Sequence, residues 1–366
     1  MMIVYAHTYA HTREDIPVRD RPSVYEVARL AGVSTATVSR VLAGYERVLP
    51  GTRDKVLTAV SELGYVPSGA AKDLAARRTG VLGLCFPDLT GDQDTEQGDA
   101  AYWYDEVIRG MERAARRSGY AMLIAASHHR DDGGLVLSIA GRCDGLVVLA
   151  RTAPLAMIEH VAARIPVVLL ATQGGESGRA IDYLTVANET GAYQVTSHLA
   201  DAHGYTDICF IAGPPDSPDS ASRHDGFRRA TAGLGRQRAS ERRSLPAYHG
   251  DFTTAGGRRV AERIIATGRP PRALVCANDQ TAIGAMAALQ DAGLSVPGDV
   301  AVTGFDGIQL GRHMRPSLTT VVQPMAALGD TAVTMLEDRI GGAALSQRTV
   351  ELPVRLQLGG SCGCPE

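Results

Sequence analysis

The sequence predicts two different kinds of domain in one chain: a small all-α domain near the N-terminus and a larger α/β domain with two lobes. The chain has 366 residues, more than twice the roughly 150 residues of an ordinary domain. Residues 21–66 have the spacing of three short amphipathic helices. From residue 80 on, apolar strand-like runs alternate with amphipathic helical segments, which is typical of doubly wound parallel sheets.

The charge of the chain is unevenly distributed. Residues 21–80 contain 9 Lys or Arg against 5 Asp or Glu, whereas the chain from residue 81 on contains 26 against 32, and the net charge is -3. A basic N-terminal part on an acidic body suggests that the N-terminal part binds a polyanion. Hydrophobic residues make up 45% of the chain and charged residues 21%, which is enough apolar material for a folded core.

Residues 21–66 have the pattern of a helix-turn-helix domain. Ser23 and Glu26 have the spacing of a capping box, which marks the start of a first short helix. Gly32 permits the sharp turn that follows, and Ser34 can cap a second helix, TATVSRVL. Two short helices joined by a tight turn form this motif.

A third helix is expected at about residues 52–63, ending where Gly64 can adopt a left-handed conformation. The three helices should enclose a small apolar core. The side chains expected in it are Val24, Val27, Ala28, Leu30, Val38, Val41, Leu42, Val56, Leu57, Val60 and Leu63.

Two segments flank this domain. Residues 1–20 have no helical or strand period, so we expect a disordered extension and assign it no function. Residues 67–79 contain SGAAKDLAARR, which is alanine-rich enough for a helix but too short to persist alone in water. This segment should be a hinge helix or linker that needs a partner to fold.

The α/β domain should span residues 80–366 and contain two doubly wound lobes. The runs VLGLCF, AMLIAA and PVVLLA mark strands of the first lobe, and DICFIAG, ALVCAND and VAVTGFD mark strands of the second. We expect the first lobe at about residues 80–186 and 324–345. The second lobe should take up about residues 187–322 and 346–360.

These segments resemble one family closely. SVYEVARLAGVSTATVSRVL followed by TRDKVLTAVSELGYVP resembles the headpiece of the lactose-repressor (LacI/GalR-type) family of bacterial transcriptional regulators. ALVCANDQTAIGAMAALQDAG, VPGDVAVTGFD and PSLTTVVQP resemble signatures of its effector domain, which is similar to periplasmic binding proteins. The resemblance covers about residues 21–360. It implies a regulator, most simply a repressor, whose operator affinity is controlled by a sugar or sugar phosphate bound between the lobes.

The resemblance implies that the second helix of the headpiece enters the major groove of DNA. Thr35, Ala36 and Arg40 should then face base edges, where Arg40 can donate two hydrogen bonds to a guanine; its alternative role is a phosphate contact. Ser39 and the amides at the start of the helix should bind phosphates. The remaining residues of the DNA-contacting set are Tyr25, Ser34 and Thr37.

The hinge segment both matches the family and departs from it. Leu74 matches a leucine that wedges into the minor groove and kinks the DNA, and Lys72 should contact phosphates. Ser68 replaces a usual asparagine, Asp73 places a carboxylate near phosphates, and Leu49 stands where a capping serine is common. These departures predict a weaker operator affinity than the resemblance alone implies.

The resemblance also implies an effector site. Residues that match positions lining the family's cleft are Arg223 in SRHDGF, Asn278 in ANDQ, Asp306 in GFD and Gln323 before Pro324. Phe252 matches an aromatic residue that stacks on a sugar face. The aromatic run at residues 102–104, with Trp103 at its centre, forms a second wall from the opposite lobe or packs in the core. We expect Arg223 and Asp306 to approach the effector from opposite sides of the cleft.

The sequence predicts no metal site and no cofactor. Cys362 and Cys364 form a C-x-C pair, but two ligands are half of what zinc requires. The acidic stretch at residues 92–96 is similar to a calcium loop, yet Gln97 stands in place of the required glycine. The other cysteines lie in or beside apolar runs and should be reduced core thiols: Cys85, Cys143, Cys209 and Cys276.

Two other function classes have less support. An enzyme on the same fold is conceivable, but Lys55 and Lys72 are the only lysines and neither follows a glycine, so there is no Walker A motif. G-x-S-x-G and H-E-x-x-H are also absent from the sequence, and we predict no enzymatic activity. A periplasmic sugar-binding protein would need a signal peptide and would lack the headpiece.

The expected setting is a cytoplasmic homodimer on palindromic double-stranded DNA, without membrane attachment. The start MMIVYAHTYAHT has no basic signal-peptide region, and nowhere do 18 apolar residues follow one another. No leucine-heptad tail follows the last strand run, at about residues 349–358, so a coiled-coil route to tetramers is absent.

Overall fold

The chain divides into two compact units, with the boundary between Gly80 and Val81. The structure, a computed structural model, describes residues 22–42, 44–45, 47–66, 78–87, 101–127, 133–172, 174, 181–232, 248–342 and 346–365. We call residues 22–66 the headpiece and residues 81–365 the large domain, and describe each by itself. The expected extension at residues 1–20 and nearly all of the expected hinge at residues 67–79 lie outside the described residues.

The headpiece contains the predicted helix-turn-helix. Ser23 caps the first helix: its hydroxyl accepts the N–H of Glu26, whose carboxylate accepts the N–H of Ser23 at 2.7 Å. Gly32 ends this helix with φ +68°, a conformation that favours glycine. The helices are α1 (Val24–Ala31), α2 (Thr35–Leu42) and α3 (Pro50–Leu63).

The core of the headpiece differs from the prediction at two positions. Leu30 and Leu57 are 50% and 48% exposed, so their assignment to the core is wrong. Successive residues of a helix point about 100° apart, and each of these leucines lies more than a quarter turn away from the centre of its buried face. The fully buried side chains are Val27, Ala28, Ala31, Val38, Val41, Val56 and Ala59.

Helix α3 begins earlier than predicted, at Pro50. Proline is well suited to the first turn, because its missing N–H would have no partner within the helix there. Leu49 stands at the N-cap and provides no side-chain hydrogen bond. The helix therefore starts without the capping serine common in the family and ends, as predicted, at Gly64, which has φ +60°.

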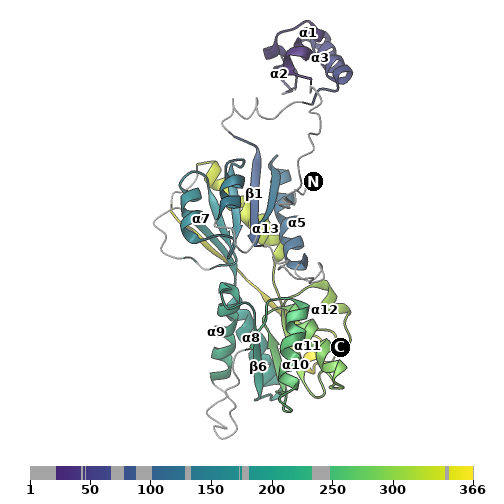
Figure 1. Ribbon diagram of the computed structural model, residues 1–366, viewed down its shortest axis with the longest axis vertical. Helices are drawn as coiled ribbons and strands as arrows, with labels where there is room; N and C mark the ends of the chain where they lie inside the picture. Colours follow the sequence, from purple (N-terminus) through teal and green to yellow (C-terminus); the bar gives the residue numbers. More distant parts are fainter. Residues whose placement is uncertain are drawn as a thin grey trace, which may run out of the picture. The chain divides into compact units, whose positions relative to one another are not determined.

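The large domain contains two six-stranded sheets, one in each lobe (Figure 1). The first has the order β11-β5-β4-β3-β1-β2 and is parallel throughout; the second has the order β12-β10-β9-β8-β6-β7, with only β12 antiparallel. The strands of the first sheet are β1 (Val81–Pro87), β2 (Ala121–Ser127), β3 (Gly145–Leu149), β4 (Val167–Leu170), β5 (Ile181–Val186) and β11 (Thr349–Leu352). Those of the second are β6 (Ile208–Ala212), β7 (Tyr248–His249), β8 (Ala273–Cys276), β9 (Ala301–Asp306), β10 (Thr319–Val322) and β12 (Arg355–Gln357).

Helices cover both faces of each sheet, which confirms the predicted doubly wound α/β fold. In the first lobe α5 packs against α13 on one face, and α6 and α7 lie on the other. In the second lobe α8 packs against α9, and α10 against α11 (Figure 1). The helices are α5 (Ala101–Arg117), α6 (Gly134–Ala140), α7 (Leu155–Ala162), α8 (Asn188–His203), α9 (Pro218–Ala232), α10 (Thr254–Ile265), α11 (Asp279–Asp291), α12 (Gln309–His313) and α13 (Met325–Ile340), with a 3-10 turn η2 at Gly360–Cys362.

The chain crosses between the lobes after β5, after β10 and after β11. The last crossing corrects the predicted lobe boundaries, because Thr349–Leu352 pair with β5 in the first sheet and only Arg355–Gln357 join the second. The strand expected at about residues 349–358 is thus two strands, interrupted next to Pro353, which has no N–H to donate. Strand patterning cannot reveal which sheet edge a strand joins.

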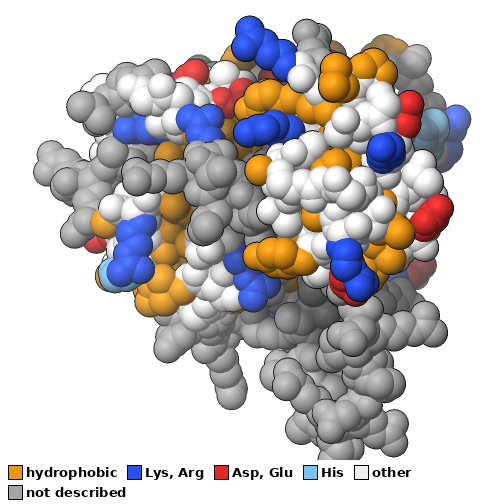
Figure 2. Space-filling view, turned by 90° about the horizontal axis from the view of Figure 1, so that it is seen from above, with side chains coloured by type: hydrophobic (Ala, Val, Ile, Leu, Met, Phe, Trp, Pro, Cys, Tyr) orange, Lys and Arg blue, Asp and Glu red, His pale blue; other side chains and the backbone are white. Residues whose placement is uncertain are grey.

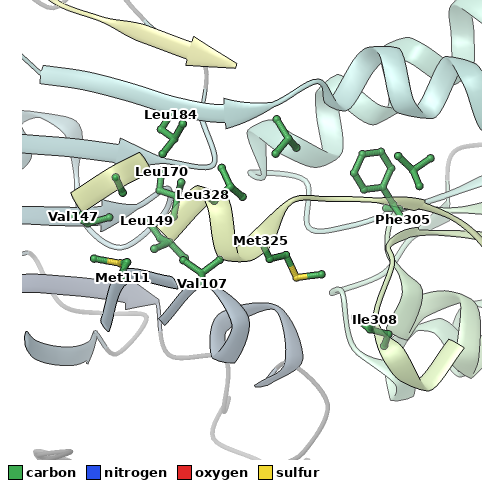
Figure 3. Close-up of a cluster of buried hydrophobic side chains, with 14 of the residues drawn as sticks. Val107, Met111, Val147, Leu149, Leu170, Leu184, Phe305, Ile308, Met325 and Leu328 are labelled. Atoms are coloured by element: carbon green, nitrogen blue, oxygen red, sulfur yellow. The ribbon is translucent and has the colours of Figure 1, made fainter. Parts of the chain in front are cut away.

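The two lobes share apolar packing where the chain crosses. One cluster of buried side chains includes Val107, Met111 and Leu149 of the first lobe together with Phe305 and Ile308 of the second. Met325 and Leu328, at the start of α13, belong to the same cluster, and Figure 3 shows Met325 between the two groups. The carboxyl ends of strands from both sheets are therefore held close to one another.

Candidate ligand pocket and nucleic-acid interface

A pocket with an empty volume of about 700 Å³, its mouth included, lies between the lobes at the carboxyl ends of their strands. Pro87, Leu149 and Ala171 line it at or after the ends of β1, β3 and β4. Asn278 and Asp306 line it at the ends of β8 and β9. This edge is where doubly wound sheets bind ligands.

The structure brings together all six residues that the sequence placed at an effector site. They are Trp103, Arg223, Phe252, Asn278, Asp306 and Gln323. Arg151 and Asp219 also line the pocket and were not among the residues predicted from the sequence. Asp219 precedes Arg223 by one helical turn, a spacing that could have indicated the pair. Nothing in the local sequence marks Arg151.

Arg223 is the central buried cation of the pocket, with only 4% of its surface exposed. Its Nε donates to Asn188 Oδ1 at 2.8 Å and its Nη1 donates to the carbonyl oxygen of Ala277 at 2.6 Å. The guanidinium lies over the ring of Phe305, 3.9 Å from the ring centroid. These contacts fix the guanidinium in one orientation.

Two carboxylates flank this guanidinium. Asp219 Oδ2 and Asp306 Oδ1 each lie 3.7 Å from a guanidinium nitrogen of Arg223. Burial raises the pKa of Asp306 to about 7 and also raises the pKa of Asp219, although in both cases Arg223 opposes the shift. Arg223 and Asp306 thus lie side by side in the second lobe, and the expectation that they face the ligand from opposite sides is wrong.

Gln323 connects the two lobes across the pocket. Its Nε2 donates to Asp306 Oδ1 at 2.6 Å, and its Oε1 accepts from Trp103 Nε1 of the first lobe at 3.4 Å. Arg151 makes a second connection, because its Nε donates to Asp216 Oδ2 of the second lobe at 2.7 Å. A ligand in the pocket would meet groups that already hold the lobes together.

Asn278 has a structural task beside its place in the pocket. Its Oδ1 accepts the N–H of Thr281 at 3.0 Å and so caps α11, while its Nδ2 donates to the carbonyl oxygen of Phe252 at 2.9 Å. The ring of Phe252 lies against Gly213, where a Cβ would collide with it. The capping asparagine and this glycine together hold the Phe252 ring at the pocket.

The aromatic run at residues 102–104 contributes to the pocket in part. Trp103 and Tyr104 line it and meet edge to face, with ring centroids 5.3 Å apart. Tyr104 also packs on Phe86, and its burial raises the pKa of its hydroxyl. Tyr102 does not line the pocket and is 45% exposed. The predictions of pocket lining and of core packing therefore both hold for part of this aromatic run, and Tyr104 combines the two roles.

Unusual backbone conformations concentrate at this pocket. Among the described residues, four that are not glycine have positive φ: Arg151 (72°), Ala171 (63°), Phe252 (70°) and Asp306 (123°). All four line the pocket. Such conformations cost on the order of 1–3 kcal/mol each and persist where the surrounding structure enforces them, often at functional sites.

The headpiece presents α2 as a candidate nucleic-acid interface. Ser34 Oγ accepts the N–H of Thr37 at 3.2 Å and so caps the helix, and it lies 2.9 Å from Thr37 Oγ1. Ala36, Ser39 and Arg40 are exposed, and the Arg40 side chain makes no hydrogen bond or ion pair with any described residue. Among the described residues, none therefore occupies the guanidinium of Arg40.

The rest of the predicted DNA-contacting set is more varied. Thr35 is half-buried, and Tyr25 on α1 is 75% exposed. Lys72 and Leu74, with Ser68 and Asp73, lie outside the described residues. In the view from above in Figure 2, Lys and Arg side chains recur over the visible surface between hydrophobic and uncharged ones.

Comparisons with known proteins give the same division of the chain. Residues 23–68 match the family described as "Bacterial regulatory proteins, lacI family", and residues 196–362 match "Periplasmic binding protein-like domain". The chain is 32% identical over 340 residues to catabolite control protein A of Priestia megaterium, with 92% of this chain and 97% of that protein covered.

Two solved structures are similar over nearly the whole chain. A complex of the transcriptional regulator CelR with cellobiose is 30% identical, with a TM-score of 0.67, and the match covers 93% of this chain and 100% of that one. The lac repressor dimer bound to operator and the anti-inducer ONPF is 25% identical, with a TM-score of 0.77, and the match covers 93% of this chain and 99% of that one.

No helix in the described part of the chain has the length and hydropathy needed to span a membrane. The headpiece carries a helix-turn-helix whose second helix is capped and exposes several side chains, the large domain carries a pocket between two doubly wound lobes, and the relatives match both parts. The chain belongs to the lacI family of bacterial regulatory proteins and is a DNA-binding transcriptional regulator with an effector-binding domain.

Proposed function

We propose that this regulator, most simply a repressor, binds a two-fold symmetric operator as a homodimer and responds to a neutral carbohydrate in the pocket between its lobes. One observation carries the effector part. Two arginines line the pocket, and both have carboxylate partners: Arg223 is flanked by two carboxylates at 3.7 Å, and Arg151 donates to Asp216 at 2.7 Å.

The chemistry of the pocket suits sugar hydroxyls. A hydroxyl both donates and accepts, and the pocket offers carboxylate acceptors on Asp219 and Asp306 beside the amide of Gln323. Phe252 and Trp103 can pack against the apolar faces of a sugar ring. A phosphate would instead have to approach two carboxylates, and a like charge there is unfavourable. We therefore favour a sugar over a sugar phosphate.

The relatives support this proposal. One structure of similar fold is described as a complex of CelR with cellobiose, and the lac repressor structure contains an anti-inducer together with operator DNA. These descriptions concern those proteins, and we extend a carbohydrate effector to this chain because its own pocket provides matching groups.

On the DNA side, we propose that α2 lies in the major groove, with Thr35, Ala36 and Arg40 toward base edges and Ser39 toward phosphates. A two-fold symmetric dimer places two such helices about one helical turn apart, which predicts a palindromic site. The hinge at residues 67–79, with Lys72 on phosphates and Leu74 in the minor groove, belongs to the same proposal. Operator binding would place the protein in the cytoplasm, and the proposal involves no catalytic step.

Coupling between the pocket and DNA would depend on the arrangement of the lobes. A ligand shifts a two-state equilibrium only through its different affinity for the two states. Sugar hydroxyls that compete for Gln323, Asp306 or Arg151 would alter the two polar connections between the lobes. The spacing of the two hinges in a dimer would then change with the lobes.

The proposal is tested by selecting bound duplexes from a random pool with the full-length chain, with and without a panel of neutral sugars and sugar phosphates. We expect a palindromic site to be enriched and one neutral sugar to change its recovery. An asymmetric site bound by a single chain would contradict the dimer. A response to sugar phosphates alone would contradict the carbohydrate assignment while leaving the DNA assignment intact.

A further inference from the structure

Four side chains of the types that bind zinc meet in the second lobe, away from the pocket. His198 and His203 come from the last turns of α8, and Cys362 and Cys364 from the C-terminal tail. Their ligand atoms all lie within 4.8 Å of one another. The C-x-C pair by itself supplies only half of the ligands that zinc requires, and the two histidines of α8 supply the other half.

Four of the six distances between the ligand atoms match those around a tetrahedral zinc ion. The Nε2 atoms of the two histidines are 3.2 Å apart, and Cys364 Sγ lies 3.4 Å from His198 Nε2 and 3.5 Å from His203 Nε2. Cys362 Sγ lies 3.6 Å from His198 Nε2. Zinc–nitrogen and zinc–sulfur bonds of about 2.05 and 2.3 Å at tetrahedral angles require about 3.3 Å between nitrogens and about 3.6 Å between nitrogen and sulfur. All four distances agree within about 0.2 Å.

Hydrogen bonding among these groups does not account for the cluster. His198 Nε2 lies within 3.6 Å of three others: His203 Nε2, Cys364 Sγ and Cys362 Sγ. One imidazole nitrogen carries either one proton or one lone pair, so it can satisfy one of these neighbours. A metal ion at the centre would satisfy all four ligand atoms at once.

The backbone of the tail is shaped to bring the two cysteines together. Gly363, between them, has φ +105°, and a Cβ there would lie 3.1 Å from the hydroxyl oxygen of Tyr205 and 3.3 Å from Nδ1 of His203. Residues 359–362 are buried against the second sheet. The hydroxyl of Ser361 donates to the carbonyl oxygen of Val302 at 2.6 Å and accepts the N–H of Thr319 at 2.9 Å. The tail is thus anchored in the lobe before it reaches the cluster.

Neighbouring groups contact two of the four side chains, Cys362 and His203. The Thr319 hydroxyl lies 3.0 Å from Cys362 Sγ, a distance at which it can donate to a thiolate. Tyr205 donates to the carbonyl oxygen of Cys362 at 3.2 Å and stacks on His203, with ring centroids 5.3 Å apart. Arg272 donates to the Tyr205 hydroxyl at 3.2 Å. Outer contacts of this kind orient the ligands of protein metal sites.

We propose that His198, His203, Cys362 and Cys364 bind one zinc ion in a closed tetrahedral site that fastens the C-terminal tail to α8. Two thiolates and two imidazoles in a tetrahedron are typical of structural zinc, and four protein ligands leave no position for a substrate. The other end of α8 carries Asn188, which bonds Arg223 and Asp219 in the pocket. The zinc site would therefore stabilise the helix that holds the pocket's central arginine.

The first test measures metal in the full-length chain without a histidine tag. We expect one zinc per chain to remain bound through gel filtration. Replacement by Co(II) should give the visible spectrum of tetrahedral cobalt with thiolate-to-metal charge transfer. Removal of zinc by a chelator should lower the unfolding temperature of the large domain, and added zinc should restore it. A chain that binds neither metal when each is supplied in excess would overturn the proposal, and this result needs no variant.

Variants then assign the ligands. His198→Gln and Cys364→Ser should each lose the zinc and the cobalt charge-transfer band. His313→Gln, which removes an exposed histidine on α12, and Cys143→Ala, which removes a thiol of the first lobe, should each keep one zinc per chain. Retention of zinc by both ligand variants would overturn the assignment. A disulfide between Cys362 and Cys364, found by mass spectrometry in protein that takes up no zinc under reducing conditions, would do the same.

Discussion

Replacement of Arg223 by methionine would test the electrostatics of the pocket most directly. Methionine keeps much of the side-chain volume and removes the charge together with every hydrogen-bond donor. Asp219 and Asp306 would lose the cation 3.7 Å away, and Asn188 Oδ1 and the carbonyl oxygen of Ala277 would each lose a donor. The change therefore leaves two buried carboxyl groups and two acceptors without their partner.

The expected loss of stability depends on pH. Removal of one partner from a buried ion pair costs about 3–5 kcal/mol, because the remaining charge stays buried. Burial already raises the pKa of both carboxyl groups, to about 7 for Asp306, so these groups can take up protons and become neutral. We expect the full cost of about 3–5 kcal/mol near pH 8 and a smaller cost near pH 5, where Asp306 is protonated.

The matched control is Arg229→Met on the same helix. Arg229 pairs with Glu189, but the side chains of both are about half exposed, and such a pair is worth less than about 1 kcal/mol. Thermal unfolding of both variants and the unaltered chain at the two pH values measures the difference, at roughly 2–4 °C per kcal/mol for a large domain. Equal stability of the two variants near pH 8, or an Arg223→Met defect that does not shrink near pH 5, would refute the reasoning.

Three further predictions concern DNA, pH and the ligand. Arg40→Ala should lose discrimination at one base pair of each half-site, by about 1–3 kcal/mol in binding to variant operators. Lys72→Ala should instead weaken binding to all sequences alike and reduce the slope of log affinity against log salt concentration by about one unit. Equal effects of Arg40→Ala on specific and random DNA would count against a base contact. Burial raises the pKa of Asp306 from an ordinary 3.8 to about 7. Protonated Asp306 therefore contributes its full share of the folding stability at a pH below 3.8, and this share is lost as the pH rises through about 7. Asp306→Asn should therefore make the unfolding temperature fall less between pH 4 and pH 8, and an unchanged pH profile would show that Asp306 ionises normally. Phe252→Leu and Trp103→Leu should each weaken binding of the effector sugar in calorimetry, by about tenfold or more if each ring contributes above 1.4 kcal/mol. Phe252→Leu should leave operator affinity without sugar unchanged, whereas Trp103→Leu also removes the donor to Gln323 that connects the lobes. Wild-type sugar affinity in both variants would move the site elsewhere.

Features that depend on neighbours in the sequence could be predicted before the structure was available. The Ser23–Glu26 capping box and the turn at Gly32 are encoded within a few residues, and the structure has both. The alternation of strand runs and helices gave the doubly wound class for the same reason, since each element is a local pattern. Five of the six predicted pocket residues came from the family resemblance and Trp103 came from the aromatic run, and the structure places all six around one pocket.

Features that depend on which elements meet were decided by the tertiary structure alone. The exposure of Leu30 and Leu57 depends on which side of each helix its partners cover. The division of the last strand run between two sheets depends on which sheet edges were free. Arg151 reaches the pocket only because the lobes face each other. His198 and Cys362 are 164 residues apart, and only the packing of the tail beside α8 makes them neighbours. Local patterns fix the elements, whereas long-range packing fixes the sites that several elements share.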